Sequence, residues 1–249
     1  MRILVINPNS TSSMTDKICE SARRVAGEGT TILCATGEPP APASIEGHYD
    51  EAMSVPGLLG RVQQAEAEGI DGVVVACFDD PGIGACREVV SGPVIGICEA
   101  AVKAASMIAT SFSVVTTLPR SVPVIEQLIH SYGLSHRCRR VRSAEIPVLA
   151  LEQEGSGAHE KVRNEILRAV REDRCEAIVL GCAGMADLAE WLTQETGVPV
   201  IDGVTVATRM VEALVACGLK TSKIGAYSSP IYNKPNAMND YDGASAKAI

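Results

Sequence analysis

The chain contains one short pattern twice, and this duplication constrains the fold more than any other feature of the sequence. Residues 73–77 read VVVAC, and residues 178–182 read IVLGC. Each run is apolar and ends at a cysteine, which is typical of a parallel strand that is buried on both faces. A Pro-Val-Ile triplet follows 16 residues after Cys77 and 17 residues after Cys182. Two copies of one unit, each with a thiol at the end of a strand, predict a cleft with a cysteine on either wall.

Composition narrows the class of protein. The 249 residues are 46% hydrophobic but include only eight aromatic residues, so the core is expected to consist of Val, Ile, Leu and Ala. The net charge of −8, without a basic cluster, argues against nucleic-acid binding. No apolar run approaches the length of a membrane span or a signal peptide. We therefore expect a cytoplasmic protein that contacts no membrane.

The nine cysteines do not form a metal-binding or disulfide pattern. Their number is odd, no CxxC pair occurs, and the four histidines show no ligand spacing with them. We expect reduced thiols and no bound metal. Most of these cysteines are expected to act as small apolar residues, and only Cys77 and Cys182 stand where chemistry requires a thiol.

Strands alternate with helices along the whole chain, which predicts an α/β protein with parallel sheets. The duplication predicts two such domains related by a pseudo-two-fold axis. We assign residues 1–97 and 208–249 to the first domain and residues 98–207 to the second. Because the last helix follows the second copy, the chain from Val204 onward is expected to pack back on the first domain. The basic, alternating segment 138–146 has the pattern of an edge strand.

Two loops and the tail complete the prediction. The turn Asn7–Thr11 joins the strand at 3–6 to a helix near 12–26, and its backbone N–H groups either hold a small polar ligand or form an ordinary turn. The Pro-rich loop 37–47 is long for a compact α/β unit, as loops that line a site often are. The polar tail from Ser228 is expected to be loosely held.

The positions of the two cysteines suggest the chemistry. Ligands of open α/β sheets bind beyond the carboxyl ends of the strands, where backbone N–H groups at a helix start favour a thiolate. Two thiols without a partner histidine can flank a carbon acid, one removing its proton while the other donates from the opposite face. This arrangement suits racemisation or epimerisation. The pairs Pro81-Gly82 and Ala183-Gly184 leave backbone N–H groups to stabilise an enolate oxygen. Alternatively, either cysteine alone is only a packing residue.

Five stretches together resemble the aspartate/glutamate/hydantoin racemase superfamily over nearly the whole chain, and within it the hydantoin racemases. The resemblance implies that Cys77 and Cys182 are the two acid/base residues, that no cofactor takes part, and that the chain forms a homo-oligomer. The stretches are INPNST at 6–11, PASIEG at 42–47, ACFDDPG at 76–82, FSVVTT at 112–117 and LGCAGM at 180–185.

The residues after each cysteine bear on the substrate. Amino-acid racemases of this superfamily usually carry Asn-Thr after the first cysteine to hold a carboxylate, whereas this chain has Phe78-Asp79 there and Ala183-Gly184 after Cys182. A neutral cyclic imide, a 5-monosubstituted hydantoin, therefore fits better than a free amino acid. Asp79 and Asp80 either cap the following helix or touch the substrate, and the cap is favoured. The candidate substrate-binding residues are Asn7, Pro8, Asn9, Ser44, Phe78, Thr117, Ala183 and Gly184.

Other functions remain open at this point. Allantoin is itself a 5-substituted hydantoin, so allantoin racemase is the second candidate function. Three alternatives come from other functional classes. They are a decarboxylase of the same superfamily, a cis–trans isomerase of the same superfamily and a non-enzymatic binder of small molecules. Paired cysteines argue against a single-thiol decarboxylase and a binder, but a cis–trans isomerase would also use two.

Overall fold

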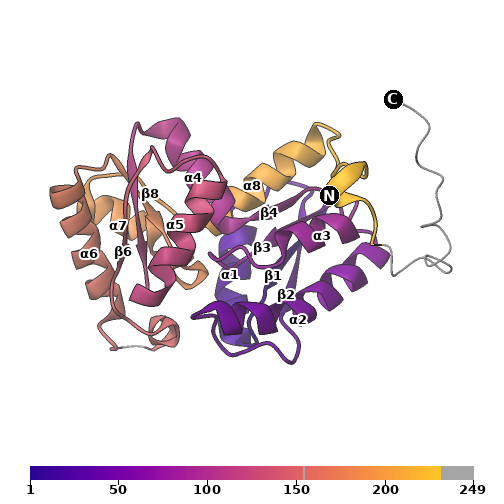
Figure 1. The fold of residues 1–249 in the computed structure, drawn as a ribbon, viewed down its shortest axis with the longest axis horizontal. Helices are drawn as coiled ribbons and strands as arrows, with labels where there is room; N and C mark the ends of the chain where they lie inside the picture. The colour runs from indigo at the N-terminus through magenta and orange to yellow at the C-terminus, as the bar shows by residue number, and fades with distance from the viewer. Residues whose placement is uncertain (154, 231–249) are drawn as a thin grey trace.

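The computed structural model of the chain describes residues 1–153 and 155–230, and within them the strands form two parallel sheets of four strands each. The first sheet has the order β2-β1-β3-β4 and the second the order β6-β5-β7-β8. We call the parts built around them the first and the second lobe (Figure 1). The strands are β1 (Arg2–Asn7), β2 (Thr31–Thr36), β3 (Gly72–Val75), β4 (Val94–Gly96), β5 (Phe112–Thr116), β6 (Cys138–Ser143), β7 (Ala177–Leu180) and β8 (Val200–Ile201).

Helices cover both sheets, and Figure 1 shows α4 and α8 in the middle of the molecule, between the two sheets. No helix among the described residues is both long and apolar enough to cross a bilayer. The α-helices are α1 (Ser12–Val25), α2 (His48–Ala67), α3 (Ile83–Val89), α4 (Ile97–Ile108), α5 (Val122–Ser131), α6 (Ala158–Asp173), α7 (Ala189–Thr196) and α8 (Gly203–Ala216). The 3-10 helices are η1 (Pro119–Ser121), η2 (Val148–Glu152), η3 (Ala183–Leu188) and η4 (Gly225–Tyr227).

The two sheets repeat one pattern of connections, which confirms the predicted duplicated α/β fold. In the first sheet β1 lies between β2 and β3, and in the second sheet β5 lies between β6 and β7. The backbone N–H of Ala76 donates to Ile6 at 2.8 Å, and that of Gly181 donates to Val115 at 2.8 Å. The residue before each predicted cysteine is thus held in the same way by the neighbouring strand. Segment 138–146 was correctly predicted as an edge strand, since β6 ends the second sheet.

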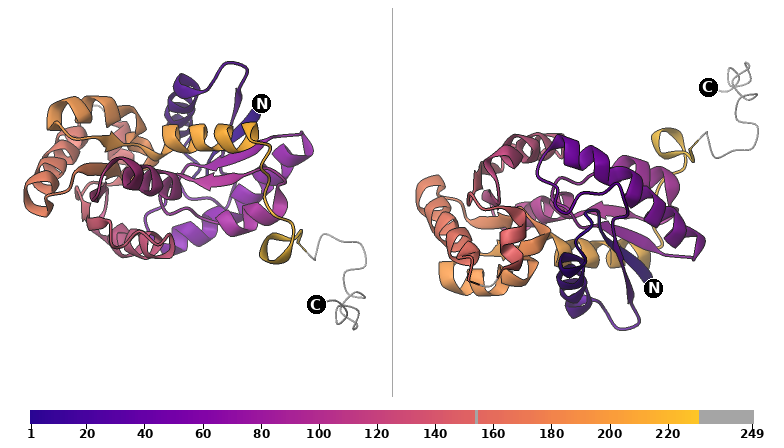
Figure 2. Two further views of the ribbon diagram at one scale, coloured as in Figure 1. Left: turned by 90° about the horizontal axis from the view of Figure 1, so that it is seen from above. Right: turned by 90° about the horizontal axis from the view of Figure 1, so that it is seen from below.

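The last helix lies against the lobe that contains the N-terminus. Helix α8 packs on α1, α4, β3 and β4, and the left view of Figure 2 shows it in front of the first lobe. The domain boundaries at residues 97 and 207 stay a prediction. The prediction of a loosely held tail concerns mainly residues 231–249, which lie outside the described residues.

The core is aliphatic, as the composition predicts. Strands β3 and β7 are buried along their whole lengths, and Ile3, Ile18 and Val74 are inaccessible to solvent. Phe112 and Phe78 are the buried aromatic side chains among the described residues. Burial of both faces explains why these strands read as unbroken apolar runs rather than as alternating patterns.

One expectation about the cysteines is wrong. Cys19 and Cys34 form a disulfide, with their Cα atoms 6.2 Å apart. Helix α1 packs across β2, and this contact brings together two residues that are 15 positions apart. Sequence spacing could not reveal the pair because packing of a helix on a strand set the distance. The other seven cysteines are free thiols.

Helices α4 and α8 cross at close range where the two lobes meet. Helix α4 begins directly after β4, and α8 begins one residue after β8, so each helix follows the last strand of its copy. Gly203 is the first residue of α8, and a Cβ atom added there would lie 2.3 Å from the carbonyl oxygen of Ile97, the first residue of α4. The contact therefore requires a residue without a side chain, and it fixes how closely the two equivalent helices approach.

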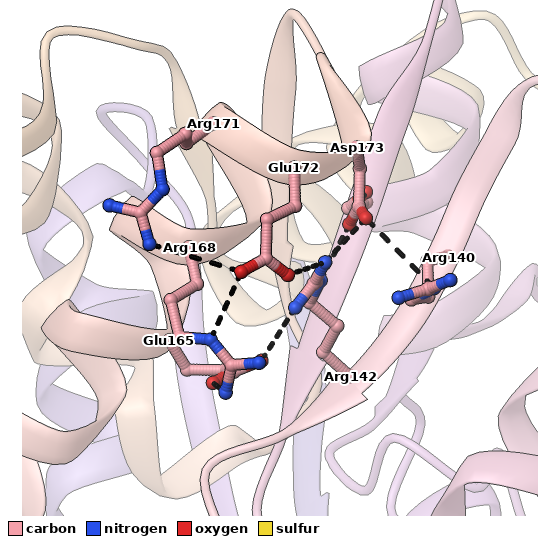
Figure 3. A network of polar contacts seen from close by, with 8 residues as sticks. Arg140, Arg142, Glu165, Arg168, Arg171, Glu172 and Asp173 are labelled. Atoms are coloured by element: carbon pink, nitrogen blue, oxygen red, sulfur yellow. Dashed lines mark hydrogen bonds and ion pairs between the residues drawn. The ribbon is translucent and has the colours of Figure 1, made fainter.

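A buried ion cluster holds the edge strand of the second lobe (Figure 3). Arg142 on β6 donates to Asp173 at 2.5 and 2.6 Å, to Glu165 at 3.0 Å and to Glu172 at 2.9 Å, and the three acids lie on α6. Ser113 of the neighbouring strand β5 donates to Asp173 at 3.0 Å. One arginine side chain thus joins strand β6 to the helix that covers it.

Candidate active site

The two strand-end cysteines line one cavity between the lobes. The cavity has a volume of about 30 Å³ and is bounded by residues at the carboxyl ends of both sheets. Cys77 follows β3, and Cys182 follows β7 and precedes η3. Both sulfurs thus border the same space, from opposite copies of the repeat. This is the location where ligands of open α/β sheets bind.

The backbone around the two cysteines is equivalent. The N–H of Asp80 donates to the carbonyl of Cys77 at 3.1 Å, and the N–H of Met185 donates to the carbonyl of Cys182 at 3.1 Å. Each cysteine therefore begins the same tight turn. The copies then differ, because η3 starts directly after Cys182, whereas α3 starts only at Ile83 after a turn that ends at Gly82.

The expectation that the site favours thiolates is wrong, because burial dominates the pKa of both cysteines. Burial raises the pKa of Cys77 well above its usual value, the charges of Asp79 and Cys182 raise it further, and a backbone N–H bond from Asp79 only partly opposes this. Burial likewise raises the pKa of Cys182 to about 12, against the N–H of Gly184. The predicted backbone donors are present at both sulfurs, but loss of hydration outweighs them.

Five of the eight predicted substrate-binding residues line the cavity: Asn7, Asn9, Phe78, Thr117 and Ala183. The other three, Pro8, Ser44 and Gly184, do not line it. The Ser44 hydroxyl donates instead to Glu46 at 3.1 Å, and the carbonyl of Pro8 lies against Gly37. Gly184 acts through its N–H at the Cys182 sulfur. Gly82, predicted to free an N–H for an enolate oxygen, does not line the cavity either.

The two asparagines of the first turn hold each other in place. The Asn7 amide donates to Asn9 at 2.7 Å and to Thr15 at 3.1 Å, and Asn7 accepts from the N–H of Asn9 at 3.2 Å. The Asn9 amide donates to the sulfur of Met14 at 3.3 Å. An amide group has two N–H donors and sulfur is a weak acceptor, so Asn9 retains donor capacity toward the cavity.

Asp79 and Asp80 have separate roles, although the sequence gives no reason to divide them. The favoured prediction, a cap on the following helix, is wrong for both, since no side chain caps α3. Asp79 lines the cavity. Asp80 points away from it and accepts from the N–H groups of Cys98 at 3.1 Å and Glu99 at 2.9 Å.

Asp80 fastens the loop after Cys77 to α4 and to the second lobe. The Tyr132 hydroxyl, at the end of α5, donates to Asp80 at 2.6 Å. In the second copy, Asp202 caps its own helix α8 by accepting from Thr205 at 2.9 Å. The position equivalent to Asp202 is Gly96, where an added Cβ would lie 2.1 Å from the Asp80 carboxylate. In the first copy the cap of the helix therefore comes from the loop that carries Cys77.

The loop 37–47 contributes to the cavity, as its length predicts. Ile45 and Val148 of η2 both line the cavity, and the Glu46 carboxylate accepts from the N–H of Val148 at 3.2 Å. The loop therefore reaches across from the first lobe to the second. Seven further lining residues were not predicted, because their positions depend on how the lobes meet: Met14, Ile45, Ala76, Thr116, Ser121, Val148 and Gly181.

The cavity is poor in positive charge. Its lining, among the residues described, includes no Lys, Arg or His side chain. In the same part of the chain, no group of three or more His, Cys, Asp or Glu side chains is arranged to hold a metal ion. The site therefore offers thiols, amide and hydroxyl groups and one carboxylate.

The fold is that of the aspartate and glutamate racemase group of α/β proteins. Residues 3–211 match the model of the Asp/Glu/Hydantoin racemase family. The chain belongs to this family, and it is an isomerase of the racemase type.

The similar proteins include racemases named for two substrates, hydantoin and allantoin. The hydantoin racemase of Rhizobium meliloti is 55% identical over 92% of this chain and 95% of its own length. The solved structure of the allantoin racemase from Klebsiella pneumoniae is 50% identical, with a TM-score of 0.91, and covers 92% of this chain and 94% of its own. The allantoin racemase of Pseudomonas fluorescens is 42% identical, with a TM-score of 0.88, and covers 92% of this chain and 97% of its own.

Proposed function

We propose that the chain racemises 5-monosubstituted hydantoins without a cofactor, using Cys77 and Cys182 as the two acid/base groups at C5. The observation that carries this proposal is that equivalent strand-end cysteines border one cavity that lacks a cationic side chain. A hydantoin is neutral at its ring and needs no cationic partner. A free amino acid brings a carboxylate that this lining does not neutralise.

The reaction follows from the chemistry of C5. The thiolate of one cysteine removes the C5 proton, and the electron pair moves into the adjacent C4 carbonyl to give a planar enolate. The thiol of the other cysteine donates its proton to the opposite face of C5, which inverts the centre. The reverse reaction exchanges the two roles, so the enzyme needs one thiolate and one thiol in either direction.

The amide and hydroxyl groups around the thiols would position the ring. The Asn9 amide has donor capacity for a ring carbonyl, and hydrogen bonds that strengthen as the enolate forms would lower the barrier. Thr117 supplies a hydroxyl from the second lobe. The ring would thus be held by neutral groups from both copies of the repeat.

Allantoin is the second candidate substrate, because the two allantoin racemase structures are 50% and 42% identical to this chain. The ring and the C5 centre are the same, and only the C5 substituent differs. The predicted homo-oligomer and cytoplasmic location stay predictions.

Loss of optical rotation from pure enantiomers tests the substrate. We expect protein dialysed against a chelator to racemise hydantoins with apolar C5 substituents far faster than aspartate or glutamate, and thiol alkylation to abolish the activity. Faster turnover of allantoin would favour the second candidate. Turnover of maleate, a preference for an amino acid, or recovery only on adding metal would contradict the proposal.

Reaction in D₂O tests the two-base mechanism. Early product should carry deuterium at C5 while the remaining substrate stays protonated. Changing either Cys77 or Cys182 to Ser should abolish racemisation, because a hydroxyl of much higher pKa is a poor base. Each variant should still exchange the proton of one enantiomer, with opposite hands. Substantial racemisation by either variant would point to a single base or to another pair of thiols.

A further inference from the structure

We propose that Asp79 is the specificity residue of the cavity: its carboxylate accepts a hydrogen bond from an N–H of a neutral ring and excludes molecules that carry a carboxylate. This inference rests on the proposed function and names the group that selects its substrate. Asp79 is two residues from Cys77, so the same turn that presents the thiol also presents the acid.

The Asp79 side chain is buried at the cavity without a protein partner. Its residue is 8% exposed and lines the cavity with both cysteines. Burial and the charge of Glu51 raise its pKa to about 7, the charge of His48 opposes them, and no hydrogen bond to the carboxylate contributes among the described residues. Its neighbour Asp80, equally buried, has three hydrogen-bond donors. The Asp79 carboxylate oxygens are not fully enclosed by protein, so a ligand in the cavity can supply the donor that the protein does not.

The surroundings make the cavity unfavourable for an anion. The charges of Asp79, Glu152 and Glu46 all act on Cys182 in the direction that opposes a negative sulfur. A substrate carboxylate would meet the same repulsion without a cationic side chain in the lining to offset it. A desolvated like-charge contact is a means of rejecting a wrong ligand as well as of binding the right one.

The hydantoin ring matches this arrangement in its donors and charge. It carries N–H groups at N1 and N3, and either is a donor to a carboxylate. Addition of water across the N3–C4 amide opens the ring to an N-carbamoyl amino acid, which keeps the substituent but carries a carboxylate at former C4. The closed and opened forms of one compound therefore differ mainly in charge, and they are a direct probe of Asp79.

The test compares Asp79→Asn and Asp79→Ala with the natural protein at pH 8.5. For both variants we expect the KM for a 5-alkyl hydantoin to rise about tenfold, because loss of a hydrogen bond to a charged group weakens binding by about that factor. We expect the inhibition constant of the corresponding N-carbamoyl amino acid to fall about tenfold, because the repulsion is gone. Asp187→Asn is the matched control, since it removes the same charge from an exposed position in η3 near Cys182. It should change neither constant.

Unchanged constants in both Asp79 variants would overturn the inference. So would a fall in kcat alone, because it would mean that Asp79 acts on the thiols and not on selection. The folded state is checked by circular dichroism. If the natural protein does not turn over hydantoins, the proposed function fails, and calorimetric binding of the N-carbamoyl amino acid to the natural protein and to Asp79→Asn still tests charge exclusion on its own.

Discussion

Cys77 and Cys182 occupy equivalent residues of the two copies, and their surroundings keep protons on both sulfurs. Burial is the largest cause for each, and neighbouring acids add to it. Burial costs the thiolate its hydration, and backbone N–H groups recover only part of that cost. At this scale the site resembles a pair of weak acids that ionise one at a time.

The pH dependence of kcat/KM checks this protonation state. Because the pKa of Cys182 is about 12 and that of Cys77 lies well above its usual value, the fraction of thiolate should increase by up to tenfold per pH unit across neutral pH. We therefore expect kcat/KM for a hydantoin to rise continuously between pH 6 and pH 8. A plateau already reached at pH 7 would show a preformed thiolate and would contradict the electrostatics of the cavity.

Among the elements, strand β6 depends on one side chain for its attachment. Arg142 is 5% exposed and contacts three acids of α6. Burial opposes ionisation of Asp173, but hydrogen bonds from Arg142 and Ser113 outweigh it and lower the pKa of Asp173. Removing Arg142 leaves that carboxylate buried without its main partner.

The substitution Arg142→Met should reduce the free energy of unfolding by about 3–5 kcal/mol, the usual cost of breaking a buried pair from one side. The control Arg168→Met removes an arginine that pairs with Glu165 and Glu172 of the same cluster but is 54% exposed. It should cost no more than about 1 kcal/mol. Urea denaturation at pH 7 measures both, and equal losses would show that burial does not decide the difference.

The sign of the acid dependence follows from Asp173. Its pKa is lower in the folded state than in the unfolded chain, so its contribution is complete above the unfolded value of about 3.9 and is lost as pH falls through the folded value. The difference in stability between the natural protein and Arg142→Met should accordingly shrink below pH 4.

For the molecule as a whole, the active cavity depends on how the two lobes meet. The α4–α8 crossing is the central contact, and it contains Gly203 against the backbone of Ile97. An added methyl group there meets a carbonyl oxygen, which cannot rotate away as a side chain can. A shift of the helices would change the separation of the two thiols.

The substitution Gly203→Ala should therefore lower stability by about 1–3 kcal/mol and lower kcat for racemisation. Gly60→Ala in α2 is the control, because no atom lies within 4 Å of its added Cβ. It should be neutral or stabilising by up to about 1 kcal/mol, since Ala favours the helix. Thermal unfolding and kcat measured on both variants decide the matter, and full activity in Gly203→Ala would show that the lobes tolerate the displacement.

The sequence by itself determined the duplicated α/β fold, the order of strands and helices and the equivalence of Cys77 with Cys182. These properties are local or periodic: an apolar run predicts a strand buried on both faces, and a repeated run predicts a repeated unit. Of the candidate binding residues, Asn7, Asn9 and Phe78 could be predicted in this way because they lie at or just after the ends of strands of the first sheet, whose carboxyl ends meet at one edge.

The tertiary structure decided everything that depends on distance between remote segments. It directed Asp79 into the cavity and Asp80 to α4, joined Cys19 to Cys34, and brought Ile45 and Val148 to the same cavity. It also set the protonation of the thiols, because burial depends on all the atoms that surround a group and not on its neighbours in the chain. Asp79 and Asp80 have the same side chain but different surroundings, because the backbone turns between them. The packing of the two lobes fixes the direction of that turn.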